Sequence, residues 1–386
     1  MGEDQAVSER ESAKCKEIHQ RPRLKMVVVG PQPPGCASLG ISIKDIELMN
    51  ELGVDAYRFS ISWSRILPTG KRSGGISKEG IKYYNDLIDQ LILNGKTPFV
   101  TLYHVDRPHA LEEEYGGFLD SRMVDDFKDF CDVCFENFGG KVKHWTTLNE
   151  PYTYCYQCYT VGNMAPGRCS YWQKLDCLDG DSATEPYVVG HNLLLAHSAA
   201  VELYNTKYKQ TQKGQIGITL DSIWCVPYSN KDYDKKAALR EIDFKLGWFL
   251  EPLTSGNYPK IMQQLVGDRL PKFSEEQSKK LKGSYDFIGI NYYTSQFAKH
   301  MHATIDAPPS NVTDSRTASG MYVYPRGLRE LLRHIKQNYN DPIIYVTENG
   351  MADYEDLSLP IDEAAMDIRR IDYYYRHLHH LLSAIK

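Results

Sequence analysis

The sequence lacks long hydrophobic runs. No stretch of its 386 residues approaches the ~18–20 uninterrupted apolar residues that a membrane-spanning helix needs. It also lacks an excess of basic residues, because 45 Lys and Arg stand against 50 Asp and Glu, a net charge of −5. A general nucleic-acid binder needs a basic face to meet phosphates. Neither a membrane nor a nucleic acid is therefore an expected partner.

The glycine-rich loop that cradles phosphates in dinucleotide-binding folds is also missing. The segment Gly30-Pro-Gln-Pro-Pro-Gly35 contains glycine, but its prolines have no N–H group to offer to a phosphate. We interpret it as a turn and expect no cofactor.

The amino-terminal residues 1–23 are polar and highly charged, and they predict a disordered leader. The first apolar run, Leu24–Val29, is shorter than the core of a signal peptide and contains a lysine. No signal peptide is visible, so a cytoplasmic location is the default expectation. Cys169 and Cys177 bracket a short polar loop and can form a local disulfide in an oxidising compartment.

Nine cysteines are present, an odd number. The pairs Cys131-x-x-Cys134 and Cys155-x-x-Cys158 have the spacing of a zinc ribbon, so a zinc-binding structural module is one alternative. The first pair, however, lies in an amphipathic helical pattern with several phenylalanines, where a small apolar side chain would pack. Core packing is therefore the favoured interpretation, and no metal site is expected.

Strand-like and helix-like patterns alternate along the chain. Apolar runs rich in β-branched or aromatic residues occur at Ala56–Ser62, Pro98–Tyr103, His144–Leu148, Gln215–Leu220, Tyr285–Tyr292 and Pro342–Thr347. Helical stripes lie between them, and a last helix is expected over Glu363–Lys386. Repeated strand–helix units predict a parallel sheet covered by helices, and this number of units favours a TIM (β/α)8 barrel. We therefore expect an α/β fold with one barrel domain over residues 24–386.

Two glutamates end such strands in matching settings. Glu150 and Glu348 each follow an apolar run and lie beside an asparagine. A residue that breaks the strand comes next, Pro151 after Glu150 and Gly350 after Glu348 and its asparagine. Barrel enzymes carry their chemistry at the carboxyl ends of the strands. Paired carboxyl groups suit glycoside hydrolysis, in which one donates a proton and the other, about 5–5.5 Å away in retaining enzymes, attacks the sugar.

The segments around these glutamates, Thr147-Leu-Asn-Glu-Pro151 and Val346-Thr-Glu-Asn-Gly350, resemble the two signature motifs of glycoside hydrolase family 1, which includes the plant β-glucosidases. The resemblance extends from about Ile43 to Lys386. Other matching motifs follow in the family's order: Asp55–Pro68, Leu102–Leu111 and Gly289–Thr294. It implies a retaining β-glucosidase that hydrolyses O-β-D-glucosides of plant specialised metabolites, of the defence or alkaloid-glucoside type. Many relatives are secreted or vacuolar, so the compartment stays unknown.

The resemblance also implies catalytic roles. Glu150 matches the general acid/base, and Glu348 matches the nucleophile that forms the covalent glycosyl-enzyme. Tyr293 matches a phenol that hydrogen-bonds the nucleophile, and Arg58 matches the cation beside it, which keeps that carboxylate ionised.

Substrate-binding residues follow from the same resemblance. Asn149 matches a residue that bonds the sugar 2-hydroxyl, and His104 matches a contact near the 3-hydroxyl. Asn291 and Tyr293 line the same substrate pocket. Trp63 and Trp145 are interpreted as core residues.

The sequence also departs from the family. The first barrel strand, with its sugar-clamping glutamine, is replaced by Leu24–Gly30, and the eighth strand is missing beyond Lys386. We expect an incomplete, truncated barrel with exposed strand edges. Lost sugar contacts predict weak or no activity.

Two alternatives remain open. An inactive family member could bind and modulate a full-length paralogue, or form a homo-oligomer, through the exposed edges. A transferase could pass the glucosyl group to an acceptor alcohol instead of water.

Overall fold

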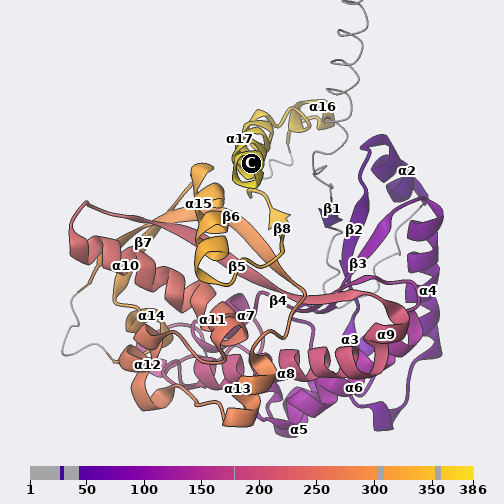
Figure 1. Cartoon of the computed structure of the whole chain (residues 1–386), viewed down its shortest axis with the longest axis horizontal. Helices are drawn as coiled ribbons and strands as arrows, with labels where there is room; N and C mark the ends of the chain where they lie inside the picture. Colours follow the sequence, from indigo (N-terminus) through magenta and orange to yellow (C-terminus); the bar gives the residue numbers. More distant parts are fainter. Residues whose placement is uncertain (1–26, 30–42, 178, 302–307, 353–357) are drawn as a thin grey trace, which may run out of the picture.

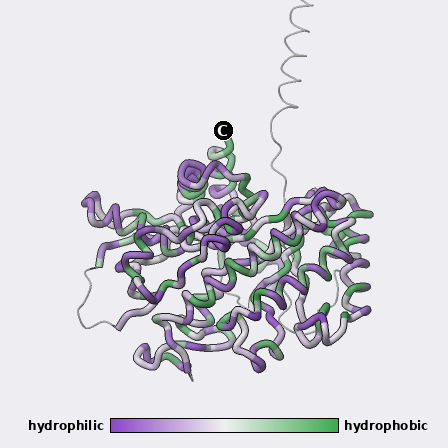
Figure 2. The backbone as a smooth tube through the Cα atoms, turned by 60° about the horizontal axis from the view of Figure 1, so that its bottom comes forward, coloured by the Kyte–Doolittle hydropathy of each residue, from purple (hydrophilic) through white to green (hydrophobic). Residues whose placement is uncertain are grey.

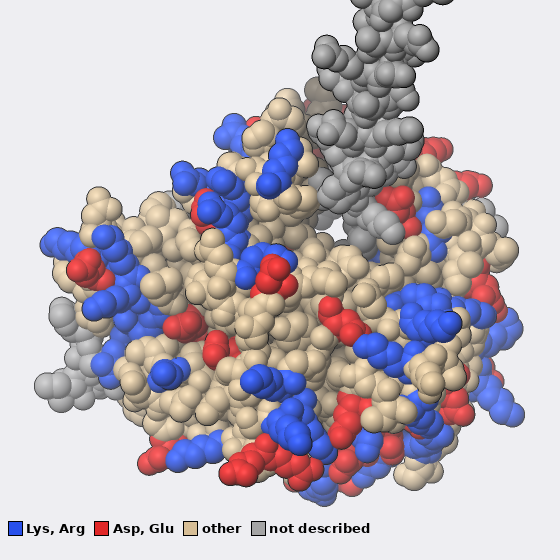
Figure 3. Space-filling view, viewed as in Figure 1, with Lys and Arg blue, Asp and Glu red and all other residues tan. Residues whose placement is uncertain are grey.

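The computed structural model describes residues 27–29, 43–177, 179–301, 308–352 and 358–386 (Figure 1). The predicted leader over residues 1–23 lies outside them. Within the described ranges no helix is both long and apolar enough to cross a membrane. Basic and acidic side chains are intermixed over the face shown in Figure 3.

Eight strands of the described residues form one curled sheet. They are β1 (Val27–Val29), β2 (Ala56–Ser60), β3 (Thr97–Tyr103), β4 (His144–Asn149), β5 (Gln215–Pro227), β6 (Phe287–His300), β7 (Thr317–Tyr322) and β8 (Ile344–Asn349). The strands from β1 to β6 pair in parallel in chain order, and β8 pairs in parallel with β6. This order is that of a barrel.

All six predicted strands are present, and the burial of their side chains explains why the sequence is apolar there. The side chains of β2, β3 and β4 are almost all buried, as expected for parallel strands that are covered on both faces. Strands β5 and β6 are longer than predicted. They remain paired with each other as far as Pro227 on β5 and Ala298 on β6. The outer part of β6 also pairs antiparallel with β7, a strand that the sequence analysis did not predict.

Helices surround the sheet (Figure 1). The larger ones are α2 (Ile43–Glu51), α4 (Lys78–Leu93), α6 (Arg122–Phe138), α7 (Pro151–Tyr159), α8 (Glu185–Leu203), α10 (Asp232–Ile242), α11 (Trp248–Ser255), α15 (Arg326–Asn338) and α17 (Ile368–Ile385). The shorter ones are α3 (Trp63–Ile66), α5 (His109–Tyr115), α9 (Lys209–Gln212), α12 (Lys260–Val266), α13 (Glu275–Leu281), α14 (Asn311–Asp314) and α16 (Ile361–Ala364). Hydrophobic and hydrophilic residues alternate along the outer helices (Figure 2), as expected when one face packs inward.

The last predicted helix, Glu363–Lys386, is in fact two helices. The short α16 ends at Ala364, and α17 begins at Ile368. The Asp367 side chain accepts a hydrogen bond from the backbone N–H of Arg370 and so caps the new helix. The helical periodicity of the sequence did not reveal this break.

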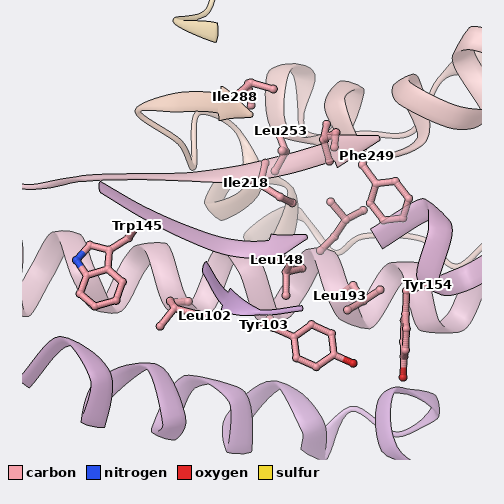
Figure 4. Close-up of a cluster of buried hydrophobic side chains, with 14 of the residues drawn as sticks. Leu102, Tyr103, Trp145, Leu148, Tyr154, Leu193, Ile218, Phe249, Leu253 and Ile288 are labelled. Atoms are coloured by element: carbon pink, nitrogen blue, oxygen red, sulfur yellow. The ribbon is translucent and has the colours of Figure 1, made fainter. Parts of the chain in front are cut away.

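A continuous core lies between the sheet and the helices, and Figure 4 shows part of it around Trp145 and Leu148. Trp63 and Trp145 are fully buried. Trp63 stacks on Phe130 with ring centroids 5.0 Å apart. Both tryptophans are core residues, as the sequence predicts.

The cysteines of the two CxxC pairs, Cys131, Cys134, Cys155 and Cys158, are free thiols buried in this core. Burial raises the pKa of each thiol, so they remain protonated and pack as small apolar groups. In the part of the chain that the structure describes, no group of three or more His, Cys, Asp or Glu side chains is placed to hold a metal ion. Cys169 and Cys177 are joined by a disulfide.

The barrel is incomplete, as the sequence predicts. Strands β1 and β8 lie at the two ends of the curled sheet (Figure 1), and no ladder of hydrogen bonds joins them among the described residues. The replacement segment supplies β1, which pairs with β2 from Val27↔Ala56 to Val29↔Arg58. The open side of the sheet is therefore next to β8, the strand that carries Glu348.

Truncating Trp63 should destabilise the fold strongly. The Trp63→Ala variant removes a fully buried ring that stacks on Phe130, and such truncations cost about 3–5 kcal/mol. Urea unfolding monitored by circular dichroism measures the loss. Tyr171→Ala is the control, because Tyr171 is 96% exposed and its truncation should change stability by less than about 0.5 kcal/mol. Equal effects of the two substitutions would contradict the assignment of Trp63 to the core.

Candidate active site

The carboxyl ends of the strands bring the two predicted glutamates to one place. Glu150 follows β4 and precedes α7, whose first residue is Pro151. Glu348 lies in β8, where its Cα partner on β6 is Asn291. The Asn291 side-chain amide donates a hydrogen bond to Glu150 Oε1 at 2.7 Å. Residues almost two hundred positions apart therefore meet around a single asparagine.

Glu150 has an unusual backbone conformation. Its φ of 48° and ψ of 58° lie in the left-handed region, which residues other than glycine rarely adopt. The Glu150 N–H donates to the Thr219 carbonyl oxygen at 3.0 Å, so the neighbouring strand β5 holds the turn in place. Strained backbone of this kind is common at functional sites, where surrounding contacts maintain it.

Glu348 is surrounded by groups that suit a carboxylate anion. The fully buried guanidinium of Arg58 contacts Glu348 Oε1 at 2.6 Å, and the Tyr293 hydroxyl donates to Oε2. Burial and then the nearby Glu348 raise the pKa of Tyr293, so this phenol keeps its proton and remains a donor. Charge-assisted hydrogen bonds to both oxygens stabilise an ionised carboxylate.

Glu150 has the opposite environment. Burial is the main cause that raises the pKa of Glu150 to about 8, and repulsion from Asp221 and Glu348 adds to it. The hydrogen bond from Asn291 opposes the shift but does not cancel it. At neutral pH Glu150 is therefore a protonated acid beside an anion, the division of labour that acid-catalysed glycoside cleavage requires.

The other predicted residues form one hydrogen-bonded network with this pair. Arg58 donates to Asn149 Oδ1 at 2.6 Å, and the Asn149 amide nitrogen lies 3.1 Å from His104 Nε2. Asn291 donates to the same Asn149 oxygen at 3.2 Å. Burial, with a smaller effect of Arg58, lowers the pKa of His104 to about 4, so the ring is neutral at physiological pH. The structure thus brings together all the predicted catalytic and sugar-binding residues.

The sequence analysis did not identify one carboxyl group of this site, that of Asp221. It follows the apolar run Gln215–Leu220, so the signal that drew attention to Glu150 and Glu348 was also present here. Asp221 is the Cα partner of Asn291 on the side away from Glu348. Its neighbour Thr153, in the first turn of α7, was not identified either.

A cavity of about 640 Å³ adjoins the site on the Glu150 side. Its wall includes Tyr152, Thr153, Asp221, Glu241, Lys245 and Gln296. The tyrosine ring and the methylene groups offer apolar surface, and the other groups can fix the orientation of a polar ligand.

An α/β barrel sheet with two carboxyl groups meeting at the ends of its strands suits glycoside hydrolysis. The chain belongs to glycosyl hydrolase family 1, whose model matches residues 33–386. Its named relatives are plant β-glucosidases, and this chain is a glycosidase of the β-glucosidase type.

The comparisons agree at the level of sequence and structure. The chain is 50% identical to "Beta-glucosidase 12" of Oryza sativa subsp. indica, over 89% of this chain and 70% of that protein. It is 51% identical to "Isoflavonoid 7-O-beta-apiosyl-glucoside beta-glycosidase" of Dalbergia nigrescens, over 89% of this chain and 65% of that protein. A mutant of the rice Os3BGlu6 β-glucosidase, solved "in a covalent complex with Glc from GA4GE", superposes with a TM-score of 0.87 and 45% identity, over 89% of this chain and 75% of that one.

The raised pKa of Glu150 predicts a pH-dependent difference in stability. A carboxyl group whose native pKa is above its unfolded value loses native stability as the pH rises between the two values, because the unfolded chain ionises first. Glu150→Gln removes this loss. Between pH 5 and 8 the free energy of unfolding of the variant should therefore rise relative to the wild type, by up to about 4 kcal/mol.

Urea unfolding at a series of pH values measures this difference. Glu276→Gln is the matched control, because it makes the same substitution at a side chain that is 79% exposed. Parallel stability curves for Glu150→Gln and the wild type would show that Glu150 titrates normally.

Proposed function

We propose that this chain is a retaining β-glucosidase that hydrolyses O-β-D-glucosides of plant specialised metabolites, and that residues 24–386 form its single catalytic domain. The observation that carries the proposal is the meeting of Glu150, with its raised pKa, and the Arg58-bound Glu348 around Asn291. The same chemistry is general to the family to which the chain belongs.

In the first step Glu348 attacks the anomeric carbon. A bond forms between a Glu348 oxygen and that carbon, and the bond to the leaving oxygen breaks as Glu150 gives it a proton. Arg58 and Tyr293 hold the nucleophile through its two oxygens and orient it for attack. His104 and Asn149 bind the sugar hydroxyl groups.

In the second step water releases the sugar. Glu150, now a carboxylate, removes a proton from a water molecule, whose oxygen attacks the anomeric carbon while the bond to Glu348 breaks. Glucose leaves, Glu150 regains its proton and Glu348 returns to its ionised state.

The 640 Å³ cavity is the place that we propose for the leaving group, although neither Glu150 nor Glu348 lines it. Glu150 delivers its proton to the leaving oxygen, so the aglycone must extend from the Glu150 side of the pair. The cavity adjoins Glu150 through Thr153 and Asp221, and its volume lies within the range for pockets that bind small organic molecules. The name of the relative from Dalbergia nigrescens also gives an isoflavonoid glycoside as its substrate.

Turnover is expected to be slow. The sheet is open between β1 and β8, beside the strand that carries the nucleophile. An open side admits water and removes neighbours that would otherwise position Glu348 and the sugar. Loss of positioning contacts lowers the rate as well as the affinity.

Trapping the covalent intermediate tests this proposal without requiring fast turnover. In Glu150→Gln the second step lacks its base, while an activated aryl β-glucoside can still glycosylate Glu348 because its leaving group needs little protonation. The variant should gain the mass of one hexosyl group, and peptide mapping should place it on Glu348.

The double variant Glu150→Gln, Glu348→Gln is the control and should gain no mass. A wild type that shows no turnover, together with a Glu150→Gln variant that forms no adduct, would reject the glucosidase proposal.

A second candidate is an inactive family member that binds a full-length paralogue. One observation favours it: α17 exposes an apolar stripe next to the open side of the sheet. The stripe consists of Ile368, Ile371, Tyr375, Leu378, Leu382 and Ile385, at the spacing of a coiled-coil seam. Apolar stripes and free strand edges are common sites of association.

If this second candidate is correct, the chain should co-elute with a full-length family member in size-exclusion chromatography. A Leu378→Glu, Leu382→Glu variant should abolish the co-elution, because it places charges in the stripe. Separate elution of the two proteins would eliminate the candidate.

A further inference from the structure

The carboxyl ends of β6 and β8 are where the proposed nucleophile receives its contact from a phenol. The pairing of these two strands runs as far as Tyr292↔Asn349. Tyr293 follows Tyr292 and Glu348 precedes Asn349, so the hydrogen bond from Tyr293 to Glu348 forms at the last pair of the ladder. On its other side β8 has no paired strand among the described residues. The position of this contact therefore depends on what holds the two strand ends together.

One hydroxyl group of α17 joins these strand ends. The Tyr373 hydroxyl donates to the backbone carbonyl oxygen of Tyr293 at 2.7 Å and accepts a hydrogen bond from the Asn349 side-chain amide at 3.0 Å. The same amide nitrogen donates to the carbonyl oxygen of Tyr292 at 2.7 Å. A phenol has one hydrogen to donate and can also accept, so both of its bonds can exist at once. Three hydrogen bonds thus connect α17, β6 and β8 directly beside the nucleophile.

The Tyr373 ring is held firmly on α17, which Figure 1 shows beside β8. Tyr373 is 2% exposed, and its ring stacks on that of His377 with centroids 3.8 Å apart. His377 follows about one helical turn later and is itself fully buried. Its Nδ1 atom lies 2.7 Å from the Tyr373 carbonyl oxygen, which fixes the orientation of the imidazole ring. A buried ring with little freedom to move therefore presents the hydroxyl group to the strand ends.

The Tyr293 side chain needs this support of its backbone. It is 43% exposed, so packing fixes its ring less than that of a buried residue. Its hydroxyl reaches Oε2 of Glu348, while Arg58 holds the other oxygen of the same carboxylate. Active-site groups must be held within about 0.5 Å of their working positions. A shift of the Tyr293 backbone would move the phenol away from the carboxylate and leave Glu348 less well oriented.

We propose that Tyr373 is a positioning residue, which holds the carboxyl ends of β6 and β8 together so that the Tyr293 hydroxyl stays on Glu348. It acts through Tyr293 and Asn349 rather than on the substrate. The inference deepens the proposed function, on which it rests for the role of Glu348 as the nucleophile. It also makes α17 part of the support of the site, next to the strand whose outer edge is unpaired among the described residues.

Carbon-13 NMR of tyrosine-labelled protein tests this positioning without requiring turnover. The resonance of the Tyr293 ring carbon that bears the hydroxyl is identified by its loss in Tyr293→Phe. Its position in Glu348→Gln marks a phenol that has lost the carboxylate anion. Tyr373→Phe keeps the stacked ring and removes only the hydroxyl. In this variant the Tyr293 resonance should move toward its position in Glu348→Gln, because both changes weaken the same charge-assisted hydrogen bond.

Tyr204→Phe is the matched control. Tyr204 is also a fully buried tyrosine, and its hydroxyl accepts a hydrogen bond at 3.1 Å from the backbone N–H of Gly214, just before the amino end of β5. This variant should leave the Tyr293 resonance unmoved. An unmoved resonance in Tyr373→Phe, or an equal shift in Tyr204→Phe, would overturn the proposal.

Asn349→Leu is a second variant, which breaks the network from the side of β8. It should move the Tyr293 resonance in the same direction but less far, because the Tyr373 hydroxyl can still donate to the Tyr293 carbonyl oxygen. If Tyr373→Phe does not fold, an unmoved resonance in Asn349→Leu overturns the proposal instead.

The trapping reaction then separates this inference from the proposed function. In the Glu150→Gln background, Tyr373→Phe should slow the formation of the hexosyl adduct on Glu348 by about ten-fold, because a misplaced nucleophile reacts slowly. The glucoside concentration that gives half the maximal rate should not change, since the sugar-binding side chains keep their contacts. When Tyr293→Phe is also present, Tyr373→Phe should cause no further slowing, because its effect passes through the Tyr293 hydroxyl.

Equal slowing with and without the Tyr293 hydroxyl would show that Tyr373 acts in another way and would reject the positioning role. A Glu150→Gln protein that forms no adduct, together with a wild type without turnover, would reject the glucosidase. The NMR shifts would still decide whether Tyr373 positions Tyr293.

Discussion

The buried ion pair between Arg58 and Glu348 is the contact on which the site depends. Arg58 lies on β2 and Glu348 on β8, two strands that are not neighbours in the sheet, yet their side chains meet at 2.6 Å. A buried guanidinium is strongly destabilising without partners, so Arg58 requires the carboxylate of Glu348 and the amide oxygen of Asn149. This requirement ties the strands on the two sides of the open sheet across its interior. It also fixes the orientation of Glu348, the proposed nucleophile.

The second constraint is the unequal environment of the carboxyl groups. Glu348 has a buried cation and a phenol, whereas Glu150 has burial and two neighbouring acids. The protein therefore obtains an acid and an anion from the same residue type within one site. Asp221 belongs to this arrangement because the β5–β6 register places it beside Asn291. The cluster therefore places three carboxyl groups in different surroundings around one asparagine.

The open side of the sheet affects both proposed functions. It lies beside β8, the strand that carries Glu348, the proposed nucleophile. The exposed apolar stripe belongs to α17, the last helix, which Figure 1 shows beside β8. Catalysis needs this region to be rigid, while association with another protein would use its exposed edges. Both candidate functions, glucosidase and binding partner of a paralogue, therefore depend on the open side of the sheet.

Much of this molecule could be predicted from its sequence. The six apolar runs indicated the strands, because a strand that is buried on both faces must be apolar along its length. The motifs around Glu150 and Glu348 identified the family, and the family model confirms it. The sequence did not reveal β7 or the break before α17, since antiparallel pairing with β6 and the cap by Asp367 depend on contacts of single residues. It also did not distinguish Asp221 from other acidic residues that follow an apolar run.

By itself, the sequence determined the order of strands and helices, the core tryptophans and the identity of the two glutamates, because apolar periodicity and local motifs are properties of neighbouring residues. Only the tertiary structure decided that the pKa of Glu150 is raised. This pKa depends on burial and on charges from distant parts of the chain, here Asp221 and Glu348. Among the described residues the tertiary structure likewise decided that no ladder of hydrogen bonds joins β1 to β8, because closure is a matter of which edges meet in space.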